Sequence, residues 1–278
     1  MSAKIAIGET LATAARLVLD RSGELFRVGL ILILGLFAIG IFALDYLLPL
    51  LRTTVPQVGG ATGGQPMTDP RFLPALLLML VVEFLLISIF AVGWHRLILL
   101  GPRAGGRLGI GFGRREMAYL GRMWLCFLGV MIFSMAVGVL EALLAGILRA
   151  NPPSFIMLAL FGYSFVAAYV IGRIGLSFAG VSIDQKLSFA ASWQVTRGEG
   201  FRILAIYVLV AAGWFLAGLL LDFLAALLGL GYIAPYAFLF VTAILSSGFI
   251  ALLVTINSIL FHRLSGWQPG ALQPVSGG

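Results

Sequence analysis

Four carboxylates stand inside long apolar runs of this sequence: Asp45, Glu83, Glu141 and Asp222. A charged carboxylate in hydrocarbon is costly unless it is paired, hydrated or protonated, so each is a candidate for proton transfer or cation binding. Asp45, Glu141 and Asp222 fall near one end of their runs, where water or a partner is within reach. For these three, two interpretations stay open: pairing between helices that fixes their alignment, or a vestibule for an ion or substrate.

Glu83 differs because it stands near the middle of its run, with Val82 and Phe84 beside it and no cation close in sequence. It must face the protein interior or be neutral. One interpretation is a proton carrier or cation site; the other is a protonated structural group. In either case, polar residues of the last apolar run are the expected hydrogen-bond partners: Ser246, Ser247, Thr255 and Asn257.

The positions of three arginines suggest an internal repeat. Arg27, Arg122 and Arg202 each precede an apolar run, and the carboxylate near the end of that run follows 18, 19 and 20 residues later, respectively. A second apolar run follows each time and ends close to another arginine. This spacing predicts three copies of one unit, an interfacial helix followed by a membrane hairpin, arranged around a pseudo-threefold axis.

The composition indicates that lipid surrounds most of the chain. Hydrophobic residues make up 61% of the sequence, charged residues only 10%, and the mean hydropathy is +1.08. Six runs reach the roughly 20 residues needed to cross a bilayer, and backbone groups in lipid must pair within each segment, which requires helices. The predicted fold is therefore an all-α, polytopic membrane protein with six spans: about 28–50, 72–95, 124–148, 154–172, 203–229 and 232–261.

The net charge of +7 is explained by membrane orientation rather than by nucleic-acid binding. With the N-terminus in the cytoplasm, all 18 lysines and arginines except Arg52, Arg71 and Arg149 fall on the cytoplasmic side, as the positive-inside rule requires. We therefore expect both termini in the cytoplasm and no nucleic-acid partner. The strong preference for arginine over lysine is typical of GC-rich bacterial genomes and favours a bacterial inner membrane.

The predicted organisation has three parts. Residues 1–27 form a cytoplasmic amphipathic helix, because polar and apolar side chains over 5–26 recur with helical period. Residues 28–264 form the membrane domain, which includes a second, short basic interfacial helix around 112–120. Residues 265–278, rich in Pro and Gly, form a flexible cytoplasmic tail.

Several arginines of the cytoplasmic segments are candidates for binding anionic lipid headgroups. A cation near an anionic membrane surface contributes about 1 kcal/mol to such binding. The simpler interpretation is that these residues only set the orientation of the helices. The selected residues flank predicted spans or lie in predicted interfacial helices: Arg114, Arg115, Arg122, Arg173, Arg197 and Arg202.

The segment 183–202 is the most distinctive stretch of the chain. Ser188 is placed to cap a short helix, and Phe189 and Trp193 follow one turn apart on its apolar side. Such a helix belongs at the membrane interface.

A Ser-Phe-x-x-Ser-Trp-x-x-Thr-Arg-Gly pattern runs from Ser188 to Gly198, with Arg173 before it and Arg202 after it. In this pattern the chain resembles a bacterial family of multi-pass proteins related to the membrane domain of some glycerophosphoryl diester phosphodiesterases. The resemblance implies the membrane architecture and a link to lipids. The soluble catalytic barrel of those enzymes has no counterpart in this sequence, so their activity is not implied.

Motifs of catalysis and metal binding are absent from the sequence. The glycine-rich segment 101–121 lacks the Lys-Ser/Thr of a Walker loop and the strand that precedes a dinucleotide fingerprint. His95 and His262 stand at the ends of two spans without the additional ligands of a zinc site, so we interpret them as interfacial anchors. We expect no catalytic activity, no cofactor and no metal.

These observations favour a non-enzymatic envelope protein that binds anionic lipid, or a membrane-protein partner, through its basic segments. The alternative is a proton- or cation-coupled transporter or channel with Glu83 as the coupling group. The two hypotheses place the functional site differently: lipid binding would use the charged ends of the helices, whereas coupled transport would use the middle of a span.

Overall fold

The computed structural model describes residues 5–50, 69–101, 112–148, 152–229 and 234–268. Within these ranges the secondary structure is helical, without strands, and six helices are long and apolar enough to cross a membrane. The predicted fold class, an all-α polytopic membrane protein, is confirmed. Each predicted span overlaps one of the six helices, although the ends differ by several residues.

The first two helices are α1 (Ile7–Asp20) and α2 (Ser22–Phe42). The single helix predicted over 5–26 is wrong, because the chain turns at Arg21, where φ is −107° and ψ is 26°. The Arg21 side chain donates a hydrogen bond of 2.8 Å to the carbonyl of Leu97, far away in sequence. A tertiary contact thus accompanies the turn, and the first membrane helix begins earlier than its hydropathy suggests.

Helix α2 continues into a π-helical turn, η1 (Ala43–Leu47), and packs against α4 (Phe72–Leu100). Gly101 ends α4 with φ of 87°, in the left-handed region that glycine adopts without a steric penalty. These helices form the first membrane hairpin.

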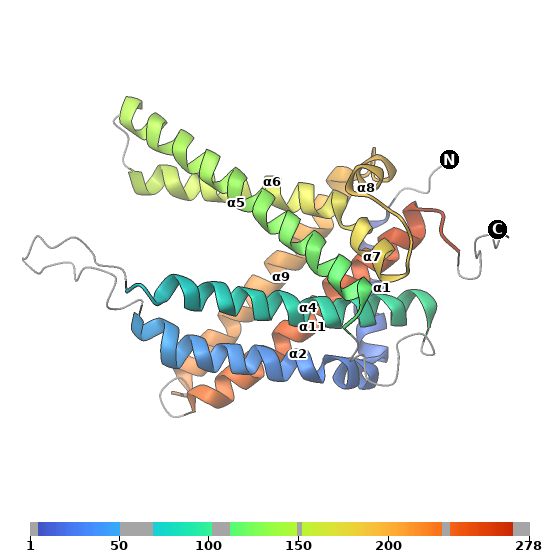
Figure 1. Cartoon of the computed structure of the whole chain (residues 1–278), viewed down its shortest axis with the longest axis horizontal. Helices are drawn as coiled ribbons and strands as arrows, with labels where there is room; N and C mark the ends of the chain where they lie inside the picture. The colour runs from blue at the N-terminus through green and yellow to red at the C-terminus, as the bar shows by residue number, and fades with distance from the viewer. Residues whose placement is uncertain (1–4, 51–68, 102–111, 149–151, 230–233, 269–278) are drawn as a thin grey trace, which may run out of the picture.

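The second hairpin consists of α5 (Arg114–Leu148) and α6 (Pro152–Ile174). The separate interfacial helix expected around 112–120 is wrong, because α5 runs without a break from Arg114 into the membrane span. Gly121 does not interrupt the helix, since its backbone stays helical. In Figure 1 this hairpin diverges from the α2–α4 hairpin with distance from α7.

Two short helices, α7 (Leu176–Ser182) and α8 (Phe189–Val195), connect α6 to α9 (Gly200–Leu227). The predicted cap of α8 is confirmed, because Ser188 Oγ accepts a hydrogen bond of 3.1 Å from the backbone N–H of Ala191. Helix α7 was not predicted, and it lies buried against α4, α5 and α11.

The last helix, α11 (Pro235–Leu264), packs mainly against α1, α2 and α4, and only weakly against α9. The third hairpin is therefore more open than the first two. Because the three hairpins do not pack alike, these contacts do not establish a triplicated unit. The unit and its pseudo-threefold axis stay predictions from the sequence.

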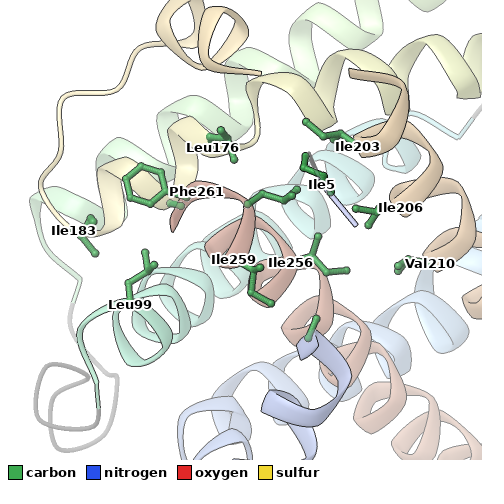
Figure 2. Close-up of a cluster of buried hydrophobic side chains, with 13 residues drawn as sticks. Ile5, Leu99, Leu176, Ile183, Ile203, Ile206, Val210, Ile256, Ile259 and Phe261 are labelled. Carbon is green, nitrogen blue, oxygen red and sulfur yellow. The ribbon is translucent and has the colours of Figure 1, made fainter. Parts of the chain in front are cut away.

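Buried side chains concentrate at the end of the bundle that carries α1, α7 and α8, hereafter the charged end (Figure 1). One cluster joins Ile5 to side chains of α7, α9 and α11 that point toward one another (Figure 2). A second surrounds Phe90 and Trp94 of α4. Farther along the helices, large apolar side chains such as Leu220 and Phe223 are exposed, a surface that suits lipid.

Candidate functional site

The end of the bundle opposite the charged end carries Asp45, in the π-helical turn η1. Tyr236 donates a hydrogen bond to its carboxylate, with distances of 3.1 and 3.4 Å to the two oxygens. Asp222 is exposed and forms no ion pair with a described residue, whereas the side chain of Glu141 lies outside the described part. The predicted gathering of three acids therefore stays a prediction.

The three arginines predicted to lie outside the cytoplasm give no further support for pairing of these acids between helices. Arg52 and Arg149 lie outside the described residues. Arg71 pairs with its neighbour Asp69 at 3.4 Å, and its side chain is largely exposed. This ion pair joins residues two positions apart, and Arg71 forms no ion pair with the described side chains of Asp45, Glu83 and Asp222.

Glu83 is partly buried on α4, and it forms no hydrogen bond or ion pair with another described residue. Two of the expected partners on α11 are engaged elsewhere: Thr255 Oγ1 accepts from Trp94, and Asn257 Oδ1 accepts from Tyr207, at 2.8 and 2.7 Å. Ser247 donates to its own helix backbone. The polar environment that a coupling carboxylate needs is thus not assembled from these residues.

His95 is fully buried, so the interpretation of this residue as an interfacial anchor is wrong. Its Nδ1 lies 2.8 Å from Ser258 Oγ, while that hydroxyl donates its proton to the carbonyl of Val254. The imidazole must therefore donate from Nδ1, which leaves Nε2 without a hydrogen bond in the described part of the chain. Packing between α4 and α11 explains the burial, whereas His262 is exposed as expected.

The Ser-Phe-x-x-Ser-Trp-x-x-Thr-Arg-Gly segment encloses Arg173, which is only 7% exposed. The guanidinium carbon lies 3.8 Å from the centroid of the Trp193 ring, and Nε donates to Thr196 Oγ1 at 3.1 Å. Nη2 donates to the backbone carbonyl of Trp193. Ser192 Oγ in turn donates to the backbone carbonyl of Arg173 at 2.7 Å. These contacts attach α8 to the end of α6 and leave the guanidinium little surface for a headgroup.

Arg202 and Arg197 have different environments, although both were predicted to face headgroups. Arg202 forms an ion pair of 2.9 Å with Glu199, whose carboxylate also accepts the backbone N–H of Ile5 at 3.3 Å. Arg197 is exposed after α8. The Glu199 carboxylate, which pairs with Arg202, therefore ties the start of α9 to the N-terminal segment, whereas Arg197 is left on the surface.

Three other predicted arginines come together in one cavity, hereafter the basic pocket. It lies between the start of α5 and the segment around α7, and its volume is about 320 Å³. Four cations and one carboxylate are among its lining residues, so positive charge predominates. The lining consists of Arg114, Arg115, Ala118, Arg122, Val181, Asp184, Gln185 and Lys186.

Two of the cations in the basic pocket are held in place by the protein. Arg115 forms a two-pronged ion pair with Asp184, with Nε–Oδ1 and Nη2–Oδ2 distances of 2.7 and 2.6 Å. These bonds keep the pKa of the Asp184 carboxyl below its usual value. Arg122 donates to the backbone carbonyl of Ser177. Both arginines are therefore fixed in direction before any ligand arrives.

Arg114 and Lys186 are exposed and form no hydrogen bond or ion pair with other described residues. They are therefore the cations of the basic pocket that are available to a ligand. Lys186 was not among the predicted site residues. Its proximity to Arg114 depends on how the connection between α7 and α8 folds back onto α5, for which the sequence holds no local signal.

No protein-family model, curated protein or solved structure matches this chain. The resemblance to the phosphodiesterase-associated membrane domain therefore rests on the pattern from Ser188 to Gly198 and stays a prediction. Among the residues that the structure describes, no group of three or more His, Cys, Asp or Glu side chains is placed to hold a metal. The fold itself defines an integral, multi-pass membrane protein.

Proposed function

We propose that this protein binds the headgroup of an anionic lipid in the basic pocket and acts as a non-enzymatic, lipid-associated protein of the bacterial inner membrane. The observation that carries the proposal is the placement of Arg114 and Lys186. Both are exposed in a cavity where two further arginines are already oriented. The phosphate group of a lipid would offset part of this excess positive charge and accept hydrogen bonds from the free donors of Arg114 and Lys186.

The position of the basic pocket also supports a lipid as the ligand. It lies at the start of α5, where a charged segment passes directly into a long apolar helix. Under the positive-inside rule this end of the bundle faces the cytoplasm, whose leaflet is rich in anionic lipids. The proposed orientation places the pocket at headgroup level.

Replacement of both free cations tests this proposal. Arg114→Gln with Lys186→Gln should lower the affinity for an anionic phospholipid roughly 30-fold, since two cations contribute about 2 kcal/mol. Retention of phosphatidylglycerol by the purified full chain can be measured by native mass spectrometry. Arg16→Gln with Arg27→Gln is the matched control, because it removes two exposed cations outside the pocket. Equal retention by the double variant and the control would refute the proposal.

A further inference from the structure

A second cavity, hereafter the apolar groove, lies between α5 and α6, the two helices of the second hairpin. Its volume is about 360 Å³. Its walls are almost entirely hydrocarbon, and Phe189 of α8 contributes to them as well. On α5 the groove runs from Leu125 past Cys126 and Gly129 to Phe133.

The apolar groove and the basic pocket are neighbours along α5. Arg122 lines the pocket, and Cys126, one helical turn farther on the same face, lines the groove. The guanidinium of Arg122 also lies 5.9 Å from the ring centroid of Phe189, another groove residue. The lining thus changes from charged to apolar within about one turn of helix.

The length of the apolar groove fits one leaflet of a bilayer. From Leu125 to Phe133, α5 rises about 12 Å, at roughly 1.5 Å per residue. Half of a hydrocarbon core of about 30 Å is about 15 Å. A chain that enters beside Arg122 and follows the groove therefore stays within the leaflet whose headgroups lie at the charged end.

We propose that the basic pocket and the apolar groove form one site for a single anionic lipid, with the headgroup in the pocket and one acyl chain between α5 and α6. This inference rests on the proposed function and specifies its ligand class. A soluble anion such as inorganic phosphate shares the headgroup chemistry, but it leaves the groove empty. Long-chain lipid should therefore bind much more tightly than a chainless anion.

Gly129→Phe is the variant that tests the groove. A Cβ at Gly129 meets no atom within 4 Å, so a larger side chain can occupy the groove without displacing the backbone. Gly138→Phe is the matched control, because Gly138 lies on the same helix, is equally uncrowded and does not line the groove. Both substitutions favour the helical state over glycine, so neither should unfold α5.

The measurement compares three probes on the full chain: dioleoyl phosphatidylglycerol, dioleoyl phosphatidylcholine and inorganic phosphate. Gly129→Phe should weaken binding of dioleoyl phosphatidylglycerol about tenfold or more, as expected when two or more methylene groups of the acyl chain lose their buried contacts. Binding of phosphate should not change. Gly138→Phe should behave like the wild type toward all three probes.

Cys126 offers an independent readout, because it is the single cysteine of the chain and lines the groove. Saturation with dioleoyl phosphatidylglycerol should slow its alkylation by a membrane-permeant maleimide, whereas phosphate should not. This measurement uses the wild-type protein and does not depend on the folding of any variant.

The outcomes separate the two proposals. If Arg114→Gln with Lys186→Gln lowers lipid retention but Gly129→Phe does not, the headgroup site stands and the groove is refuted. Equal loss in Gly129→Phe and Gly138→Phe, or unprotected Cys126, also refutes the groove. If phosphatidylcholine binds as tightly as phosphatidylglycerol, the headgroup site fails. If neither lipid nor phosphate binds the wild type, both proposals fail.

Discussion

Truncation of Arg173 should produce the largest loss of stability among the charged residues at the charged end. The guanidinium is buried, stacks on Trp193 at 3.8 Å and donates to Thr196 Oγ1 at 3.1 Å and to the Trp193 carbonyl. No carboxylate in the described part forms an ion pair with it. Its contribution therefore comes from stacking and from charge-assisted hydrogen bonds.

The expected magnitude follows from these contacts. A desolvated cation–π contact contributes about 2 kcal/mol, and a hydrogen bond to a charged donor roughly 1.5–3 kcal/mol. Because Arg173→Ala also relieves the cost of burying a charge, we expect a net loss of about 3 kcal/mol in the free energy of unfolding. Arg173→Lys should lower the free energy of unfolding less than Arg173→Ala, because lysine keeps the positive charge although it lacks the planar guanidinium group.

Denaturant-induced unfolding of the detergent-solubilised protein, followed by tryptophan fluorescence, measures this loss. Arg197→Ala is the control, because Arg197 is exposed only a few residues away. A double-mutant cycle of Arg173→Ala with Trp193→Leu isolates the stacking contribution. If Arg173→Ala unfolds at the same denaturant concentration as Arg197→Ala, the assignment of Arg173 as the residue that attaches α8 to α6 is wrong.

Three further predictions concern carboxylates. Asp184→Asn should increase retention of phosphatidylglycerol in native mass spectra, because it removes the one negative charge of the basic pocket and frees Arg115; unchanged retention would contradict the electrostatic role of the pocket. The pKa of Asp184 is lowered in the folded state, so the stability from its ion pair is present above the ordinary carboxyl pKa and is lost as the pH falls through the lowered value. The free energies of unfolding of the wild type and of Asp184→Asn, measured in denaturant, should therefore differ near neutral pH and converge in acid. Glu83→Gln should leave thermal stability and proton flux in liposomes unchanged, because Glu83 has no hydrogen-bond partner among the described residues; a loss of pH-dependent flux would restore the transport hypothesis.

The sequence determined those features that depend on neighbouring residues. Long apolar runs must be helical in lipid, because backbone groups there have no water to bind, and the six membrane helices follow from that constraint. The cap of α8 was predictable in the same way, since Ser188 bonds an N–H only three residues away. The three arginines at the start of α5 were also recognisable as candidates from their place beside an apolar run.

Tertiary structure decided the features that join distant residues. The Arg21 side chain at the turn between α1 and α2 bonds the carbonyl of Leu97, and the ion pair of Arg115 and Asp184 joins residues 69 positions apart. The burial of His95 follows from the packing of α4 on α11. Local periodicity reports which face of a helix is apolar, but not which neighbour covers that face. The joining of four cations into one pocket, and its continuation into the groove between α5 and α6, therefore became visible only once the helices were packed together.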